Sequence, residues 1–199
     1  MFSNPLWMLD GIDSMSDSTY SPSAHAGVSA GIKIRPATFT DARDIYALIA
    51  SDCERLITRS LTNVIENIDR FMVAVSDAGE IVGTIAYQLW AEFGNPLKTT
   101  AELQSVCVKP DWRKCGVGRA MVSAQLKRLE GLRVWQIIVL TFETRFFHHM
   151  GFETVDKHLI MHKLYRGCAN CSKHESPFTC PEVAMARPGW EEIESGRDL

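Results

Sequence analysis

The sequence predicts an α+β domain built on a central, mostly antiparallel sheet that is flanked by helices. The predicted elements follow the order strand, helices, three strands, helix, strand, helix and strand, which differs from a regular alternation of strands and helices. The segment Ser76-Asp77-Ala78-Gly79 has the composition of a hairpin turn between two of these strands. Residues 134–140 form a nearly continuous apolar run, which is typical of a central strand covered on both faces.

The first half of the domain is predicted to hold three strands and two helices. Residues 32–35 alternate apolar and polar side chains, as a short strand does. Thr40 offers a helix N-cap, and the apolar residues that follow it recur at helical spacing, namely Ala42, Ile45, Leu48 and Ile49. A second, short helix is predicted at residues 61–68. The strands at residues 71–75 and 80–90 then flank the hairpin turn.

The second half contains the longest predicted helix. A strand at residues 101–108 leads through a turn around Pro110 into a helix at residues 116–129, which ends near Gly131. The strand at residues 134–140 precedes a short helix at residues 144–150, which is stopped by Gly151. The remaining predictions are a strand at residues 153–156 paired with residues 159–163, and one helical turn at residues 181–186.

Length and composition suit one globular domain with an extension at each end. The chain has 199 residues and is 46% hydrophobic, which is enough for a sizeable core. Residues 1–30 are rich in Ser, Gly, Ala and Asp without sustained periodicity, and we expect a flexible leader there. The folded domain is assigned to residues 31–165 and a cysteine-rich extension to residues 166–199.

Charge and hydropathy argue against several classes of protein. The net charge of -3 gives no reason to expect nucleic-acid or membrane binding. No apolar run approaches the roughly 20 residues of a membrane span. Because the first basic residue is Lys33, the start of the chain lacks the basic region of a signal peptide. The uneven spacing of the six cysteines fits reduced thiols or a metal site better than disulfides, so a cytoplasmic location is expected.

The segment at residues 113–119 carries the strongest functional signal. Its sequence, Arg-Lys-Cys-Gly-Val-Gly-Arg, follows a strand and opens a helix. Glycines let the backbone approach a ligand closely, and basic side chains together with a helix N-terminus complement negative charge. The pattern therefore predicts a site for a phosphate-bearing ligand. It is not a Walker loop, since no Gly-Lys-Ser/Thr follows.

Together with the later Phe-Phe-His-His-Met-Gly-Phe at residues 146–152, this segment resembles the GNAT N-acetyltransferases over residues 32–161. The resemblance implies the GNAT fold, in which two splayed strands form an acetyl-CoA cleft. It also implies that strand residues Val106, Cys107 and Val108 contact the pantetheine arm. The pyrophosphate contacts would come from Arg113, Lys114, Cys115, Gly116, Val117, Gly118 and Arg119. Many members have Tyr where this chain has Phe147, so the thiolate would leave unaided or take a proton from water.

Four further stretches resemble the short, single-domain N-acetylglutamate synthase-like group. They are residues 58–60, residues 101–108, residues 140–147, and residues 162–165 followed by Cys168-x-x-Cys171. This narrower resemblance implies acetyl transfer to the α-amine of L-glutamate, the first step of arginine biosynthesis. No amino-acid-kinase domain is visible, so feedback control by arginine through one is not expected. GNAT domains often pair, which makes a homodimer an expectation.

The acceptor amine needs a base and carboxylate ligands. Glu102 is the candidate base because strand alternation places its side chain on one face with those of Gln104 and Val106. The alternative is a solvated or structural carboxylate. Arg35, after the first strand, and Arg59, after the first helix, are the candidate ligands for a dicarboxylate substrate, since guanidinium groups bind carboxylates in bidentate form. Ordinary surface arginines are the alternative.

The cysteine-rich extension suggests a structural zinc site. Cys168, Cys171 and Cys180 supply three candidate thiolates, and either His162 or His174 would be the fourth ligand. Reduced surface thiols are the alternative interpretation. Cys53, Cys107 and Cys115 lie in separate elements and resemble small apolar residues.

Three functions remain open at this stage. The first is glutamate acetylation, and the second is the same chemistry on another small amine or a protein N-terminus. The third is an acyl-CoA-binding sensor without turnover. Arg35 and Arg59 favour the first over the second, whereas only the cysteine-rich extension favours the third.

Overall fold

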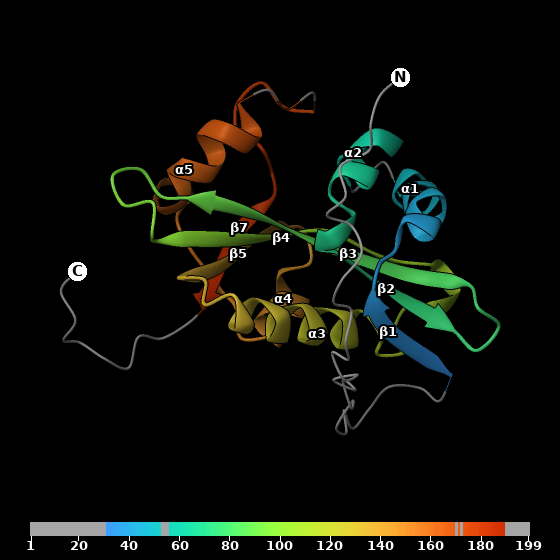
Figure 1. Cartoon of the computed structure of the whole chain (residues 1–199). Helices are drawn as coiled ribbons and strands as arrows, with labels where there is room; N and C mark the ends of the chain where they lie inside the picture. Colours follow the sequence, from blue (N-terminus) through green and yellow to red (C-terminus); the bar gives the residue numbers. More distant parts are fainter. Residues whose placement is uncertain (1–30, 53–55, 170, 172, 190–199) are drawn as a thin grey trace, which may run out of the picture.

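The computed structural model describes residues 31–52, 56–169, 171 and 173–189. Its core is one seven-stranded sheet in the order β1-β2-β3-β4-β5-β7-β6 (Figure 1). The strands are β1 (Ile32–Pro36), β2 (Phe71–Ser76), β3 (Ile81–Ala91), β4 (Thr99–Val108), β5 (Gln136–Thr141), β6 (Glu153–Thr154) and β7 (Val183–Pro188). Only the β4–β5 pair is parallel. The predicted α+β class with a mostly antiparallel sheet is confirmed. The expected leader and Cys53 lie outside the described residues.

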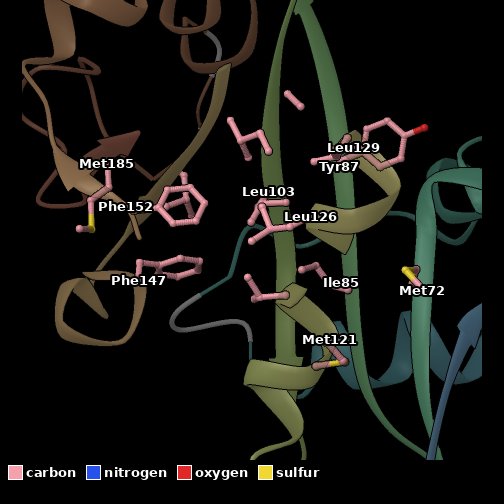
Figure 2. Close-up of a cluster of buried hydrophobic side chains, with 14 of the residues drawn as sticks. Met72, Ile85, Tyr87, Leu103, Met121, Leu126, Leu129, Phe147, Phe152 and Met185 are labelled. Carbon is pink, nitrogen blue, oxygen red and sulfur yellow. The ribbon is translucent and has the colours of Figure 1, made fainter. Parts of the chain in front are cut away.

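Helices cover both faces of the sheet. The helices α3 (Val117–Gly131) and α4 (Thr144–His148) lie on one side, and α1 (Ala42–Ala50), α2 (Leu61–Glu66) and α5 (Met161–Lys163) lie on the other (Figure 1). On the α3 side, Leu103 of β4 packs in one buried cluster with Leu126 and Leu129 (Figure 2). The same cluster includes Phe147 and Phe152, whose rings meet edge to face at 5.4 Å between centroids. This packing fixes the position of the segment that follows β5.

The other face has two separate clusters. One joins α1 and α2 to β2 and β3, and includes Ile45, Ile49 and Phe71. The second joins Ile138 of β5 to Ile160 and Leu164. Because Ile160 and Leu164 are four residues apart, they share one face of a helical turn. Residues 157–163 are accordingly helical, and the prediction of a strand at residues 159–163 is wrong.

The last strand also differs from the sequence prediction. Residues 183–188 form β7, which inserts between β5 and β6, and not a helical turn. Their side chains alternate between the two faces: Val183 and Met185 pack on the α3 side, while Ala184 and Ala186 pack on the α5 side. The sheet thus draws on a segment that the sequence had assigned to the extension, and β7 provides the backbone partner for the open edge of β5.

Helix α1 begins differently from the prediction. A 3₁₀ turn (Phe39–Asp41) precedes it and contains the predicted cap Thr40; Thr38 is the N-cap of this turn, and Asp41 is the N-cap of α1. The Asp41 carboxylate explains the choice, because it accepts hydrogen bonds from the Thr38 backbone N–H at 2.7 Å and the Thr38 hydroxyl at 2.9 Å. Local side-chain to backbone bonds of this kind decide where a helix starts.

None of the helices in the described part of the chain is long and apolar enough to cross a bilayer.

Candidate functional site

The candidate site is a cavity of about 2360 Å³ at the point where β4 and β5 part. The two strands pair only between residues 100–102 and 136–138. Beyond that point, β4 residues 103–106 and β5 residues 139–141 diverge and line the cavity from opposite sides. The parting of two neighbouring strands agrees with the fold expected from the resemblance. It leaves backbone groups of both strands available to a ligand.

A β-bulge in β4 shapes this opening. Gln104 pairs with Ala86 and Cys107 with Thr84, so Ser105 and Val106 stand opposite the single residue Ile85. Ser105 has a φ of 52°, in the left-handed region. The extra residue reverses the alternation, so Val106 packs on the α3 side while Glu102 faces α5. The prediction that Glu102, Gln104 and Val106 share a face is therefore wrong for Val106.

The first half of the cavity is formed by the loop before α3. The strand residues Val106 and Val108 line the cavity together with four loop residues, Arg113, Lys114, Cys115 and Gly116, and with Gly118 and Arg119 of the first turn of α3. Lys114 and Gly116 both have positive φ, at 63° and 83°, and Gly116 is the N-cap of α3. The first amides of α3 are therefore directed at this half, as an anion site requires.

Two residues of the predicted set do not line the cavity. Val117 is buried against the core, with 1% of its surface exposed. Cys107 packs among the residues of α1, and burial raises the pKa of its thiol to about 11. Arg113 is held in place by the Val108 carbonyl at 2.9 Å and by Asp52 at 3.0 Å.

The second half of the cavity is centred on Glu102. Its Oε1 pairs with Lys163 Nζ at 2.8 Å, and its Oε2 accepts hydrogen bonds from Trp90 Nε1 at 2.8 Å and Gln104 Nε2 at 2.6 Å. The Glu102 and Lys163 side chains are 5% and 6% exposed. Both oxygens of this carboxylate are engaged by donors, which favours the structural alternative for Glu102 over the role of base.

Lys163 stays charged in this setting. Burial lowers its pKa, but the Glu102 carboxylate and the adjacent Cys168 thiol raise it more, so the net pKa lies above the ordinary value. Its Nζ also lies 2.9 Å from Cys168 Sγ. Lys163 lies in the stretch at residues 162–165, but its pairing with β4 could not be inferred from that pattern.

Arg59 lies against β4 at the bulge. Its Nε donates to Ser105 Oγ at 2.8 Å, its Nη1 donates to Asn63 Oδ1 at 2.6 Å, and its Nη2 donates to Gln104 Oε1. Among the described residues, these hydrogen-bond acceptors are all neutral oxygens. Desolvation lowers the pKa of Arg59, with Glu102 acting in the opposite direction. The structure thus brings Arg59 to the cavity, as the sequence predicted.

Arg35 is not brought to the cavity. Its guanidinium binds Asp41 in bidentate form, at 2.7 Å and 2.9 Å, and it does not line the cavity. This geometry gives the predicted substrate-binding role of Arg35 no support, because the group is already paired with a carboxylate that fixes the start of α1.

We expect Asp41→Asn to lower the free energy of unfolding by about 1 kcal/mol at neutral pH. The hydrogen bond from Arg35 lowers the pKa of Asp41 from 3.8 to about 2. Because the folded pKa is depressed, the stabilisation is complete above about pH 4 and is lost as the pH falls through about 2. Urea unfolding of both proteins between pH 7 and pH 2 should show the difference shrinking steadily below about pH 4. A constant difference would exclude the ionised pair as its cause.

The cysteine-rich extension closes the second half of the cavity. Cys168, Cys171 and Cys180 all line it. Within the described residues, however, no three His, Cys, Asp or Glu side chains are grouped as a metal ion would require. The thiols have other neighbours: Cys168 contacts Lys163, and Cys180 donates to Glu182 at 3.7 Å. His162 is buried and does not line the cavity. The structure therefore gives the zinc prediction no support.

Glu182 and Gln104 also line the cavity, and the sequence prediction assigned neither of them a role of its own. Gln104 connects Arg59 to Glu102. Glu182 lies just before β7, whose position in the sheet was not predicted. Phe147 lines the cavity as well and has no group that could donate a proton to a leaving thiolate.

Comparisons with known proteins place this geometry among acetyltransferases. A family model described as an acetyltransferase (GNAT) domain matches residues 67–154. An uncharacterized N-acetyltransferase from Chlorobaculum tepidum is 31% identical over 132 residues, covering 66% of this chain and 79% of that protein. The amino-acid acetyltransferase of Mycobacterium tuberculosis is 30% identical over 127 residues, covering 62% of this chain and 69% of that protein.

Solved structures agree on the fold. Rv2747 from Mycobacterium tuberculosis, in complex with CoA, superposes with a TM-score of 0.64 at 23% identity, covering 78% of this chain and 98% of that chain. N-acetylglutamate synthase from Neisseria gonorrhoeae, complexed with coenzyme A and N-acetyl-glutamate, has a TM-score of 0.65 at 22% identity. That match covers 81% of this chain and 36% of the synthase chain.

Proposed function

Because this chain belongs to the GNAT acetyltransferase family, we propose that it transfers the acetyl group of acetyl-CoA to the α-amine of L-glutamate. The observation that carries the choice of acceptor is Arg59. Its guanidinium lines the cavity, and its described hydrogen-bond acceptors are neutral oxygens. A guanidinium group whose hydrogen-bond acceptors are neutral still attracts a carboxylate, because no negative charge has yet been paired with it. The similarity to an amino-acid acetyltransferase and to an N-acetylglutamate synthase supports the same acceptor class.

Acetyl-CoA occupies the first half of the cavity in this proposal. The loop at residues 113–119 and the N-terminus of α3 hold the pyrophosphate, because they combine basic side chains with free amides. The pantetheine arm runs between β4 and β5, where the strands have parted. Backbone N–H groups at the bulge of Ser105 and Val106 would polarise the thioester carbonyl in this arrangement, since the bulge frees them from regular pairing.

Glutamate occupies the second half, with a carboxylate on Arg59 and its amine directed at the thioester. The amine must lose a proton before it attacks, since it is mostly protonated at neutral pH. Attack forms a C–N bond and an oxyanion, and the collapse of that intermediate breaks the C–S bond and releases coenzyme A.

A coenzyme A release assay with acetyl-CoA and each amino acid in turn tests this proposal. We expect turnover with glutamate that clearly exceeds turnover with neutral amino acids. Turnover only with polyamines or peptides would make the chain a GNAT enzyme of another specificity. Acetyl-CoA binding without turnover on any amine would indicate a sensor.

We expect Arg59→Ala to raise the KM for glutamate roughly 10- to 100-fold, the value of one charge-assisted hydrogen bond. The KM for acetyl-CoA should change much less. Arg70→Ala is the matched control, because Arg70 is a nearby cation that donates to Gln88 and does not line the cavity. An unchanged KM for glutamate in Arg59→Ala would remove Arg59 from the acceptor site.

A further inference from the structure

Glu182 lies directly before β7, beside the end of β5. It precedes Val183, the first residue of β7, which pairs with Thr141 at the end of β5. Val183 packs on the α3 side and Ala184 on the α5 side. By strand alternation the Glu182 side chain faces the α5 side, the same side as Glu102 and Lys163. Glu182 therefore reaches the second half of the cavity from the strand next to β5.

The surroundings of Glu182 differ from those of Glu102. Glu102 has three strong donors, whereas the described hydrogen bond to Glu182 is a weak one, from Cys180 Sγ to Oε2 at 3.7 Å. The Glu182 side chain is half-buried, so its carboxylate is partly desolvated where it meets the cavity.

The hydrogen bond from the Cys180 thiol to Glu182 is weak and is easily exchanged for one from a substrate ammonium group. A half-buried carboxylate that lines the cavity and, among the described residues, accepts a single weak bond has the properties of a general base.

We propose that Glu182, and not Glu102, is the general base that deprotonates the acceptor amine; this inference rests on the proposed acetyltransferase function. The Glu182 carboxylate takes one proton from the ammonium group, and the freed nitrogen lone pair attacks the thioester carbonyl carbon. When the C–S bond breaks, its electron pair goes to the coenzyme A sulfur. A second proton leaves the nitrogen and ends on that sulfur, and Glu182 returns its proton to water. In this mechanism Glu102 acts as a positioning residue that holds Lys163, Trp90 and Gln104.

The pH dependence of Glu182→Gln tests the proposal. At about pH 7 we expect kcat/KM for glutamate to fall about 100-fold, within the range of general-base catalysis. The deficit should shrink to less than about tenfold near pH 9.5, because the amine then loses its proton to solvent. A merely structural role would lower the rate by the same factor at every pH. Acetyl-CoA binding, followed by calorimetry, should be unchanged, which also reports that the variant is folded.

Two further variants complete the experiment. Glu175→Gln removes an exposed carboxylate of the same extension outside the cavity, and it should retain the wild-type pH profile. Glu102→Gln should lower kcat/KM for glutamate, but the fall of kcat/KM towards acidic pH (the acidic limb of the pH profile) should remain. The proposal is overturned if Glu182→Gln keeps the wild-type profile, or if Glu102→Gln alone abolishes the limb. Absence of turnover in the wild-type protein with every amine would instead reject the proposed function itself.

Discussion

Replacing Gly116 with valine is expected to raise the KM for acetyl-CoA more than 100-fold while leaving the protein folded. Gly116 is the N-cap of α3 and has a φ of 83°. A β-branched residue is disfavoured there by about 1–2 kcal/mol. The side chain would also project from the loop proposed to hold the pyrophosphate, and each lost hydrogen bond to a charged group costs about 1.5–3 kcal/mol. Initial rates at saturating glutamate give the measurement.

Gly79→Val separates the loss of binding from the backbone strain. Gly79 lies in the β2–β3 turn with a φ of 81°, a Cβ built there meets nothing within 4 Å, and the residue does not line the cavity. Both variants should therefore lose a similar free energy of unfolding, but only Gly116→Val should lose affinity for acetyl-CoA. Equal KM values for the two variants would show that the loop at residues 113–119 does not hold the donor.

The first half of the site could be predicted because it is local. A strand, a basic glycine-containing loop and a helix N-terminus are contiguous in the sequence, so the pattern at residues 113–119 already contains the geometry. The cavity lining includes most of that segment. Val117 is the exception, because as the first residue of α3 its side chain turns into the core.

For the second half, the sequence named Arg59 and Glu102 as candidates but did not predict their surroundings, because these are assembled from distant segments. The residues of this half come from four separate segments, which meet only once the sheet has formed: Arg59 precedes α2, Glu102 lies in β4, Lys163 in α5, and Glu182 precedes β7. The β4 bulge at Ser105 moves Val106 to the opposite face of the sheet. The residue types around Ser105 do not predict a bulge at this position. The strand β7 was missed because its short alternation of small and apolar residues follows a cysteine-rich, loop-like stretch.

Arg35 illustrates a different limit. An arginine at the end of a strand is an equally good candidate for binding a substrate carboxylate or a carboxylate of the protein. Asp41 lies six residues away in the sequence, and it is this acidic group that the guanidinium binds. Sequence spacing alone does not separate these two outcomes, whereas Arg59 has only neutral acceptors among the described residues.

Lys163→Met is expected to produce the largest loss of stability, about 3–5 kcal/mol in the free energy of unfolding. The substitution keeps the apolar stem but removes the cation from a pair whose two side chains are 5–6% exposed. Glu102 would then hold an uncompensated charge inside the protein, with only the Trp90 and Gln104 hydrogen bonds remaining. Chemical denaturation at pH 8 provides the measurement.

Lys109→Met is the matched control for this prediction. Lys109 pairs with Glu80 on the surface, where the two side chains are 35% and 55% exposed, so its loss should cost less than about 1 kcal/mol. The double variant Glu102→Gln/Lys163→Met should recover part of the stability lost by Lys163→Met, since no buried charge is left unpaired. It should not recover full activity, because Arg59 donates to Gln104 and Gln104 donates to the Glu102 carboxylate, so the loss of that carboxylate disturbs the position of both side chains. A Lys163→Met protein as stable as the Lys109→Met protein would mean that the Glu102–Lys163 pair is hydrated in solution, and Glu102 would then return as a candidate base.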